Sequence, residues 1–315
     1  GGEALYGDLG MIPNVPPALA EACSISDLGK QQWKEQRIPV LDGSRAACDW
    51  KTDADSTAPG VFGPAASPHL FRTDYVTQSN DSYWLTNPKQ PLSGYSPIWG
   101  DEATARSLRT RLGLDQVAKR VAGTDKLAGA KFDITTLQQV MYGNRHLGAE
   151  LARDDLVKLC WQSAKPKMPP ACKALAGWDL KVDLDSRGAH VFHMFAENGG
   201  LKWKAPFDPK DPVNTPNTLD TANPAVLEAL EKAVDKLNEL GIPLDARLGD
   251  VQRETRGDER IPIHGGAGPE GVFNVIGVIN VFGLFNWQGN SDEGKNGSRC
   301  GCGRLDRLDR CDRLG

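Results

Sequence analysis

The 315-residue sequence lacks a stretch that could cross a membrane and lacks the surface chemistry of a nucleic-acid-binding protein. Its longest apolar run, Val272–Trp287, is interrupted by Gly and Asn residues and falls short of the roughly 18–20 residues that span a bilayer. The formal net charge is −4, and no cluster of Lys and Arg is interleaved with aromatic residues. We therefore expect neither a membrane span nor a nucleic-acid partner.

Common catalytic motifs are also missing. The sequence has no Gly-x-Ser-x-Gly element, and no Ser-x-x-Lys stands out. The glycine-rich stretch His264–Gly268 lacks the Gly-Lys-Ser/Thr of a phosphate-binding loop, so a tight turn is its expected structure. No self-contained pair of nucleophile and base is therefore visible in this chain.

Metal-ligating residue types occur in two places, and neither has a complete pattern. His190 and His193 are three residues apart and would share one helix face, but no zincin-type carboxylate–histidine pattern accompanies them. Cys300, Cys302 and Cys311 could hold zinc, but the second Cys-x-x-Cys is missing. We expect partly buried structural histidines in preference to a metal site.

Glycine and proline are abundant, with 34 and 21 residues, which favours a loop-rich architecture over a helical bundle. Hydrophobic residues make up 39% of the chain and charged residues 25%, as is ordinary for one large or two medium globular domains. The sequence opens without Met, and Gly1–Tyr6 resembles a turn that runs into a strand. We interpret this opening as entry in the middle of a domain.

Apolar periodicity predicts both helices and strands. The clearest helix is Pro224–Leu240, because Asn223 can cap it, Pro224 suits its first position and Gly241 follows its last turn. Further helices are predicted at Ala18–Cys23, Glu102–Leu112, Leu114–Val121, Asp133–Tyr142, Gly148–Ser163 and Cys172–Trp178. The other predictions are strands within Glu3–Val15, at Leu70–Leu85 and at Val272–Ile279, a loop at Gln31–Phe62, and ambiguous periodicity at Ser186–Glu197.

The last part of the chain has a different character. Arg304–Gly315 is a series of triplets of the Arg-Leu-Asp type, and a period of three matches neither a helix nor a strand. We divide the chain into a folded part, residues 1–288, and a low-complexity tail, residues 289–315, which we exclude from the fold. An out-of-frame translation of a GC-rich repeat is an alternative origin of this tail.

Four cysteines form two pairs that flank loops. Cys23 and Cys48 enclose a loop that contains Pro and Gly, and Cys160 and Cys172 enclose another. Each pair could close its loop by a disulfide, which would fit a secreted or periplasmic protein. Two pairs of buried thiols are the alternative.

The most informative stretch is Asn80–Pro88, in which small hydrogen-bonding side chains lie beside a Tyr-Trp pair. Strands that only fill a core carry Val, Ile and Leu instead. Amide and hydroxyl groups beside large aromatics suit a site that places a few donors around a ligand oxygen. The alternative is a polar turn ahead of a surface strand.

The segment Asp74–Leu85 resembles the C-terminal half of the β-chain of penicillin-acylase-type N-terminal-nucleophile hydrolases. The resemblance extends from about Gly2 to Ile276 and includes, in the same order, Glu3–Asp8, Arg106–Gln116, Gly148–Val157, Leu184–His190 and Ile261–Gly266. It implies an α+β fold, a partial αββα sandwich with helical insertions, and a chemistry that requires no metal or organic cofactor. It also implies an amidohydrolase that acts on lipopeptides, β-lactams or acyl-homoserine lactones.

In this family a serine attacks the amide and its own α-amino group acts as the base. The resemblance places Asn80 in the oxyanion hole, with Asp81 and Ser82 holding its amide in place. A supporting arginine lies downstream in the family. Arg106 is the best match, although Ala103 or Thr104 could occupy the true position. The basic stretch Arg106–Arg111 is usually a solvated helix face, but one of its arginines could turn inward and fix Asn80 or Asp81.

The resemblance also implies missing parts. The nucleophilic serine, the backbone oxyanion donor and most of the acyl pocket would lie upstream of Gly1, in the first half of the β-chain. We therefore expect this chain to need that half and the α-chain as partners, and to be inactive alone. A binding or scaffold remnant that kept the fold is the alternative.

Overall fold

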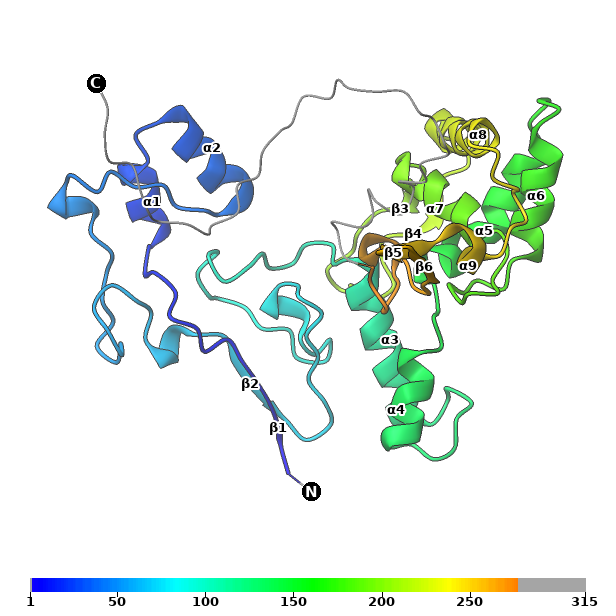
Figure 1. The fold of residues 1–315 in the computed structure, drawn as a ribbon. Helices are drawn as coiled ribbons and strands as arrows, with labels where there is room; N and C mark the ends of the chain where they lie inside the picture. Colours follow the sequence, from blue (N-terminus) through cyan, green and yellow to red (C-terminus); the bar gives the residue numbers. More distant parts are fainter. Residues whose placement is uncertain (1, 277–315) are drawn as a thin grey trace.

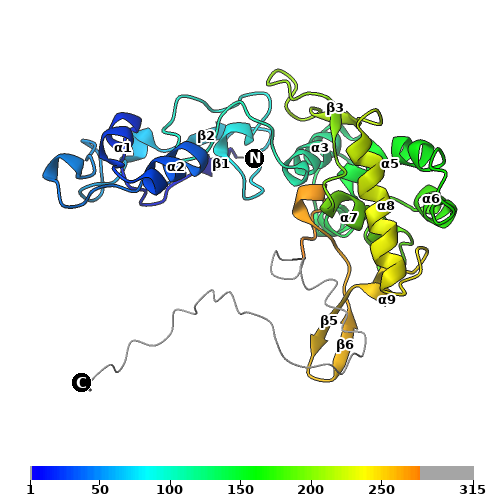
Figure 2. The same ribbon diagram turned by 90° about the horizontal axis from the view of Figure 1, so that it is seen from above.

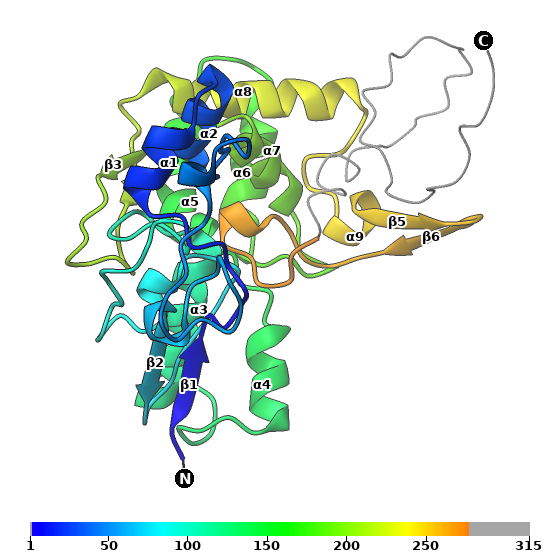
Figure 3. The ribbon, with the colours of Figure 1, turned by 90° about the vertical axis from the view of Figure 1, so that its left-hand side faces the viewer.

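The computed structural model describes residues 2–276, which form two regions that lie side by side (Figure 1). We call residues 2–106 the N-terminal region and residues 107–276 the helical region. Figure 2 shows the same division from above, with the hairpin of β5 and β6 projecting away from the helices, as it also does in Figure 3. No helix among the described residues is long and apolar enough to cross a membrane.

The N-terminal region is loop-rich. Its strands β1 and β2 pair antiparallel, with Leu5 opposite Phe71. Both of these side chains are exposed, so this face of the two-stranded ladder is uncovered among the described residues. The elements of this region are β1 (Ala4–Gly7), α1 (Pro17–Cys23), α2 (Asp27–Gln36), η1 (Ala46–Cys48), η2 (Pro64–Ala66), β2 (His69–Arg72) and η3 (Tyr83–Leu85).

The helical region contains most of the regular structure. Its helices are α3 (Leu108–Ala122), α4 (Ile134–Met141), α5 (Leu147–Cys160), α6 (Met168–Gly177), α7 (Ala189–Glu197), α8 (Pro224–Glu239), α9 (Leu248–Val251) and η4 (Gly268–Glu270). Two antiparallel ladders pair β3 (Trp203–Ala205) with β4 (Asn217–Leu219), and β5 (Arg253–Arg256) with β6 (Glu259–Pro262).

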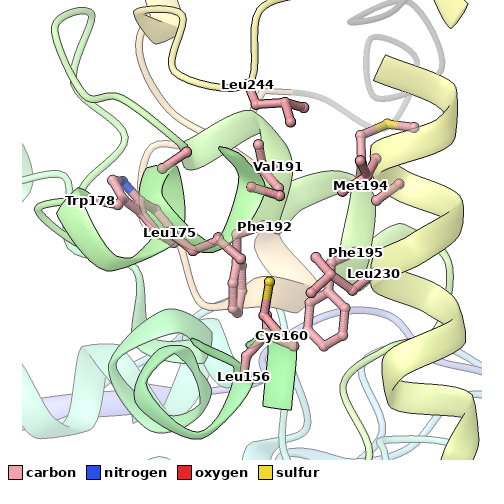
Figure 4. Packing of buried hydrophobic residues seen from close by; sticks show 14 of the residues in the cluster. Leu156, Cys160, Leu175, Trp178, Val191, Phe192, Met194, Phe195, Leu230 and Leu244 are labelled. Atoms are coloured by element: carbon pink, nitrogen blue, oxygen red, sulfur yellow. The ribbon is translucent and has the colours of Figure 1, made fainter. Parts of the chain in front are cut away.

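One core occupies the space between α5, α6, α7 and α8. Phe192 and Phe195 of α7 point toward Leu156 and Cys160 of α5 (Figure 4). The rings of Phe192 and Phe195 lie 5.4 Å apart, and Leu230 of α8 is fully buried beside them. Burial of side chains of this size stabilises the fold by roughly 1.5–3 kcal/mol each. This core is the largest cluster of buried hydrophobic side chains among the described residues.

The structure confirms the predicted start of α8 and the mixed α+β composition. Asn223 accepts a hydrogen bond from the backbone N–H of Ala225, and Pro224 occupies the first turn. Asp133 caps α4 in the same way, by accepting from the N–H of Thr136. Short polar side chains satisfy N–H groups that have no partner within a helix, which is why these starts are readable from sequence.

The two predicted disulfides are present. Cys23 and Cys48 are bonded and join the end of α1 to η1. Cys160 and Cys172 are bonded and join α5 to α6.

Several predicted elements are wrong in extent. The strand expected over Leu70–Leu85 is only β2, because the segment then turns into a loop whose polar side chains bond to the backbone. The two helices expected over 102–121 are one helix, α3, which begins after its N-cap Ser107. The loop expected over Gln31–Phe62 begins inside α2, whose end at Gln36 was missed.

The predicted buried strand Val272–Ile279 is also wrong within the described residues. Val272 and Val275 form only isolated bridges, to His146 and Gly266. Gly265 and Gly271 have positive φ and bend the chain around this segment, which limits pairing to single bridges. Residues 277–279 lie outside the described residues, as do Cys300, Cys302, Cys311 and the tail 289–315.

The expected αββα sandwich is not visible in residues 2–276, which contain three separate two-stranded ladders. Isolated two-stranded ladders gain little stability in water.

Candidate functional site

The candidate site is built on one loop, residues 74–87, which we call the Asn80 loop. Its ends are tied together by Thr77 and Thr86: the Thr77 N–H donates to the Thr86 carbonyl at 2.9 Å, and Thr86 Oγ1 donates to the Thr77 carbonyl at 2.7 Å. Asp74 closes the base by accepting from Arg72 and from the N–H of Tyr75. These bonds hold the pKa of Asp74 well below its usual range.

Asn80 lies at the tip of this loop with φ of 53°, in the left-handed region that asparagine tolerates better than most residues. Its side-chain Oδ1 lies 3.4 Å from both Nη1 and Nη2 of Arg109. Arg109 also donates to the carbonyl of Ser79. Because a guanidinium has donors and no acceptor, the amide oxygen must face Arg109.

This orientation has a chemical consequence. The Asn80 side chain is exposed, and its Nδ2–H groups have no acceptor anywhere in residues 2–276. They are therefore available to donate to a group that is not part of residues 2–276. A neutral, oriented amide donor of this kind suits an oxygen that acquires negative charge.

Asp81 fixes the loop to α3. Its Oδ1 accepts from Nη1 of Arg106 at 2.8 Å, and its Oδ2 accepts from Oγ1 of Thr110 at 2.6 Å. Burial raises the pKa of Asp81, but the hydrogen bond from Thr110 and the charge of Arg106 outweigh burial and hold this pKa below its usual value. The carboxylate is therefore ionised at neutral pH and anchors the residue that follows Asn80.

Ser82 and Tyr83 continue this anchoring on the other side of the loop. Ser82 Oγ accepts from the N–H of Trp84 and donates to the carbonyl of Asp101 at 2.7 Å. Tyr83 is fully buried and its hydroxyl donates to Glu102 at 2.5 Å. Burial, reinforced by Glu102, raises the pKa of Tyr83 above its usual value.

Apolar contacts seat the same loop on the helical region. Trp84 and Leu85 are buried with Leu114 of α3 in one cluster, and the ring of Phe207 meets Trp84 edge-on at 6.2 Å. The guanidinium of Arg106 lies 5.9 Å from the centre of the Trp84 ring. The sequence predicted a strand over Leu70–Leu85, but Tyr83, Trp84 and Leu85 form the buried 3₁₀ helix η3.

Two glycines allow the close approach of loop and helix. A Cβ on Gly113 would lie 3.1 Å from the Phe273 ring and 3.5 Å from Oγ of Ser79. A Cβ on Gly268 would lie 3.5 Å from Nε of Arg109. Glycine in a helix interior costs roughly 0.5–1 kcal/mol relative to alanine, and at Gly113 that cost is offset by packing against the Asn80 loop.

The structure brings together Asn80, Asp81, Ser82 and Arg106, the four residues that the sequence indicated. Arg106 contacts Asp81, however, and it is Arg109 that reaches Asn80. One arginine of Arg106–Arg111 was expected to turn inward and fix Asn80 or Asp81, but Arg109 was not singled out within this stretch. One signal was present: Gly113 is four residues after Arg109, so a close approach was to be expected on that face of α3.

His190 and His193 lie away from the Asn80 loop, on α7. His190 Nε2 lies 3.0 Å from the carbonyl of Pro243, and His193 Nδ1 lies 2.6 Å from Glu270. His146 donates from Nε2 to the other oxygen of Glu270 at 3.0 Å. No cluster of His, Cys, Asp and Glu that could hold a metal ion occurs in residues 2–276.

The family model for penicillin amidase matches residues 1–293. This chain belongs to the penicillin amidase family. Its resemblance to that family, inferred from the Asn80 loop and the segments around it, is thereby confirmed.

Several curated relatives are similar to nearly the whole chain. Aculeacin-A acylase of Actinoplanes utahensis is 47% identical over 284 residues, which are 87% of this chain and 36% of the relative. The acyl-homoserine lactone acylase PvdQ of Pseudomonas syringae pv. syringae is 34% identical over 289 residues, 88% of this chain and 36% of the relative. The PvdQ of Pseudomonas putida is 33% identical over 285 residues, which are 88% of this chain and 34% of the relative. The chain thus spans about a third of the length of these relatives.

Proposed function

We propose that this chain is part of an amidohydrolase that hydrolyses acyl amide bonds, and that Asn80 stabilises the oxyanion of the tetrahedral intermediate. The substrate class is an acylated small molecule such as a lipopeptide, a β-lactam or an acyl-homoserine lactone. The observation that carries the proposal is the exposed Asn80 amide, whose oxygen faces Arg109 and whose N–H groups have no acceptor in residues 2–276. Family membership supports the reaction class.

The chemistry divides between this chain and its partners. The nucleophile is an N-terminal serine carried outside residues 1–315, and its free α-amine takes the hydroxyl proton as the serine attacks the amide carbon. The carbonyl oxygen then carries negative charge, and Asn80 donates a hydrogen bond to it. The amine leaves with a proton, and water later releases the acyl group as an acid. The other partners are the α-chain and the first half of the β-chain.

In this scheme Arg109 is a positioning residue. Its charge holds the Oδ1 of Asn80 and makes the N–H groups stronger donors. Arg106 acts indirectly, because it binds the Asp81 carboxylate and thereby positions the backbone beside Asn80. Ser82 fixes the start of η3. The two disulfides support export to an oxidising compartment, either secreted or periplasmic.

The direct test uses the assembled enzyme, with this chain combined with its α-chain and the first half of the β-chain. Asn80→Ala is expected to lower kcat by about 10²–10³-fold with little change in KM, as for other oxyanion donors. Asn238→Ala, at an exposed position of α8, is the matched control and should leave kcat unchanged. An Asn80→Ala enzyme with full kcat would contradict the proposed role.

The assignment of Arg109 has a separate test. Arg109→Gln should lower kcat by a larger factor than it changes KM. Arg109→Lys should recover part of kcat, because lysine restores the charge without the planar fork of the guanidinium. A merely structural role would lower thermal stability without this rescue. If Arg106→Gln lowered kcat while Arg109→Gln did not, Arg106 would be the positioning residue instead.

The chain by itself should not hydrolyse amides, because it has no nucleophile–base pair. The measurement is release of acid from a long-chain acyl amide by the purified 315-residue chain. Turnover by this chain that disappears in Asn80→Ala would contradict the division of chemistry described above.

A further inference from the structure

Arg111 is buried in a way that no other arginine of the described residues matches. Arg111 and Arg120 are the two arginines in residues 2–276 with exposure of 1% or less. Arg120 forms an ion pair with Asp125 at 3.0 Å. Arg111 donates only to two backbone carbonyls, from Nε to Val213 at 2.7 Å and from Nη1 to Pro216 at 2.9 Å.

The charge of Arg111 is therefore uncompensated by any contact within residues 2–276, where no carboxylate forms an ion pair with it. Burial lowers its pKa to about 10, and the more distant Asp211 only partly opposes that effect. The guanidinium still carries its charge at neutral pH. Of its five N–H donors, three remain after the two carbonyl contacts. A buried charge without a counter-ion lowers the stability of the fold unless an anion binds and neutralises it.

Arg111 lines a cavity of about 480 Å³ between the start of α3, the end of α7 and the loop before β3. We call it the Arg111 cavity. Its walls are mainly apolar and include Leu108, Leu201, Trp203 and Pro216. A cavity of this size and character is typical of a site for a small molecule.

The other charged groups around the Arg111 cavity are already engaged or lie at its rim. Arg106 is paired with Asp81. Glu270 contacts both His146 and His193, and the Glu270 carboxylate raises the pKa of His193 against the opposing effect of burial. Glu197 and Lys202 are exposed, where water screens their charges. Arg111 is thus the interior charge that is left for a ligand.

We propose that the Arg111 cavity binds a small monocarboxylate with an apolar body, whose carboxylate is held by Arg111 and whose body lies against Leu108, Leu201 and Trp203. A guanidinium matches the planar geometry of a carboxylate and forms two parallel hydrogen bonds with it. Inorganic phosphate fits less well, because most of the cavity wall offers it no hydrogen bond. Asn80 and Arg109 do not line this cavity, and binding there requires no turnover.

The experiment compares octanoate with octanamide, which has the same apolar body and no charge, in calorimetric titrations of the purified 315-residue chain. Octanoate should bind with saturation and at least about tenfold more tightly than octanamide, because hydrogen bonds between charged groups are the stronger ones. Phosphate at the same concentration should not displace octanoate.

Three variants locate the binding. Arg111→Gln should bring the affinity for octanoate down to that for octanamide, since the amide keeps a donor for the nearby carbonyls and removes the charge. Lys202→Gln is the matched control, because it removes an exposed charge at the rim of the same cavity. Ala196→Phe places bulk in the cavity wall and should abolish binding of both compounds while Arg111 is intact.

Each outcome decides the proposal. Equal affinities for octanoate and octanamide, or no saturable binding, would overturn it. Loss of discrimination in Lys202→Gln but not in Arg111→Gln would also overturn it. If circular dichroism shows that Arg111→Gln does not fold, the comparison of the two compounds in the parent chain and in Ala196→Phe decides in its place. Hydrolysis is not measured in any arm, so the result is independent of the role of Asn80.

Discussion

The helical region contains one large hydrophobic core, which lies between α5, α6, α7 and α8, and a small cluster of Leu108, Leu112 and Leu147. Residues 2–106 instead distribute their buried side chains over small clusters. In the N-terminal region one cluster surrounds the Cys23–Cys48 disulfide and another surrounds Tyr6 and Tyr83. Small cores supply little stability, so such regions depend on covalent links and polar contacts. The Asn80 loop belongs to the weaker region and takes its position from the stronger one, through α3.

The largest expected effect is a loss of stability when the large core of the helical region is disrupted. Phe192→Ala should lower the free energy of unfolding by about 3–5 kcal/mol, because it removes a ring that contacts His146, Trp178 and Phe195 and leaves a cavity. Urea unfolding followed by far-UV circular dichroism measures the loss. A cost below 1 kcal/mol would mean that this core does not carry the helical region.

Removal of each disulfide should affect the two regions differently. Closing a loop of 25 residues at Cys23–Cys48 is worth about 3.5 kcal/mol in the chain-entropy model, and closing 12 residues at Cys160–Cys172 is worth roughly 3 kcal/mol. Replacing Cys23 and Cys48 by Ala should abolish hydrogen-exchange protection in residues 2–50 and leave the helical region protected.

The matched control is the replacement of Cys160 and Cys172 by Ala. This variant should unfold at lower urea concentration but stay folded at neutral pH, because its surroundings are the large core. If both double variants lost protection over the same residues, the two regions would be one cooperative unit and the comparison would be broken.

Acid should weaken the helical region through His190. Burial lowers its pKa to about 4, against the opposing effects of the Pro243 carbonyl and Asp245. Between about pH 6.5 and pH 4 the unfolded chain binds a proton that the folded chain does not, so stability falls as the pH falls through this window. The loss is about 3 kcal/mol at 1.36 kcal/mol per pKa unit.

His190→Gln should remove this part of the pH dependence, because glutamine can still donate to the Pro243 carbonyl and does not titrate. The measurement is urea unfolding of both proteins at pH 7, 5.5 and 4. His69, an exposed histidine of the N-terminal region, gives the control variant His69→Gln. Equal slopes for the parent and His190→Gln would show that His190 is not the acid-sensitive group.

The smallest effects come from matched helix caps in the two regions. Ser26 caps α2 and Asn223 caps α8, each by accepting a backbone N–H. Ser26→Ala and Asn223→Ala should each cost about 1 kcal/mol. We expect the first to appear as a local loss of hydrogen-exchange protection in α2, and the second as a shift of the whole unfolding transition. Two global shifts of equal size would argue against a weaker N-terminal region.

Short-range signals made much of the helical region predictable. Asn223 with Pro224, and Asp133 before α4, mark helix starts because a cap needs only the residues next to it. The strands were harder. Leu70–Leu85 has strand-like composition, yet Asp74 and Thr86 bond to nearby backbone and bend the chain into a loop.

The candidate site was predictable in composition but not in connectivity. Asn80, Asp81 and Ser82 were identified from the sequence, and a nearby arginine was expected. Which arginine meets which partner depends on where α3 begins. Because the helix begins at Leu108 and not at Glu102, Arg109 faces Asn80 from its first turn, and Arg106 lies before the helix against Asp81.

The sequence by itself determined the mixed α+β composition, the cysteine pairs, most helix positions and the family, since these depend on residue types and local spacing. Only the tertiary structure decided the pairing of Arg109 with Asn80 and the burial of Arg111 without a carboxylate. Both depend on segments far apart in the chain: Arg111 meets the carbonyls of Val213 and Pro216, about a hundred residues away. Side-chain charge is readable from sequence, but the partner that neutralises it is set by packing.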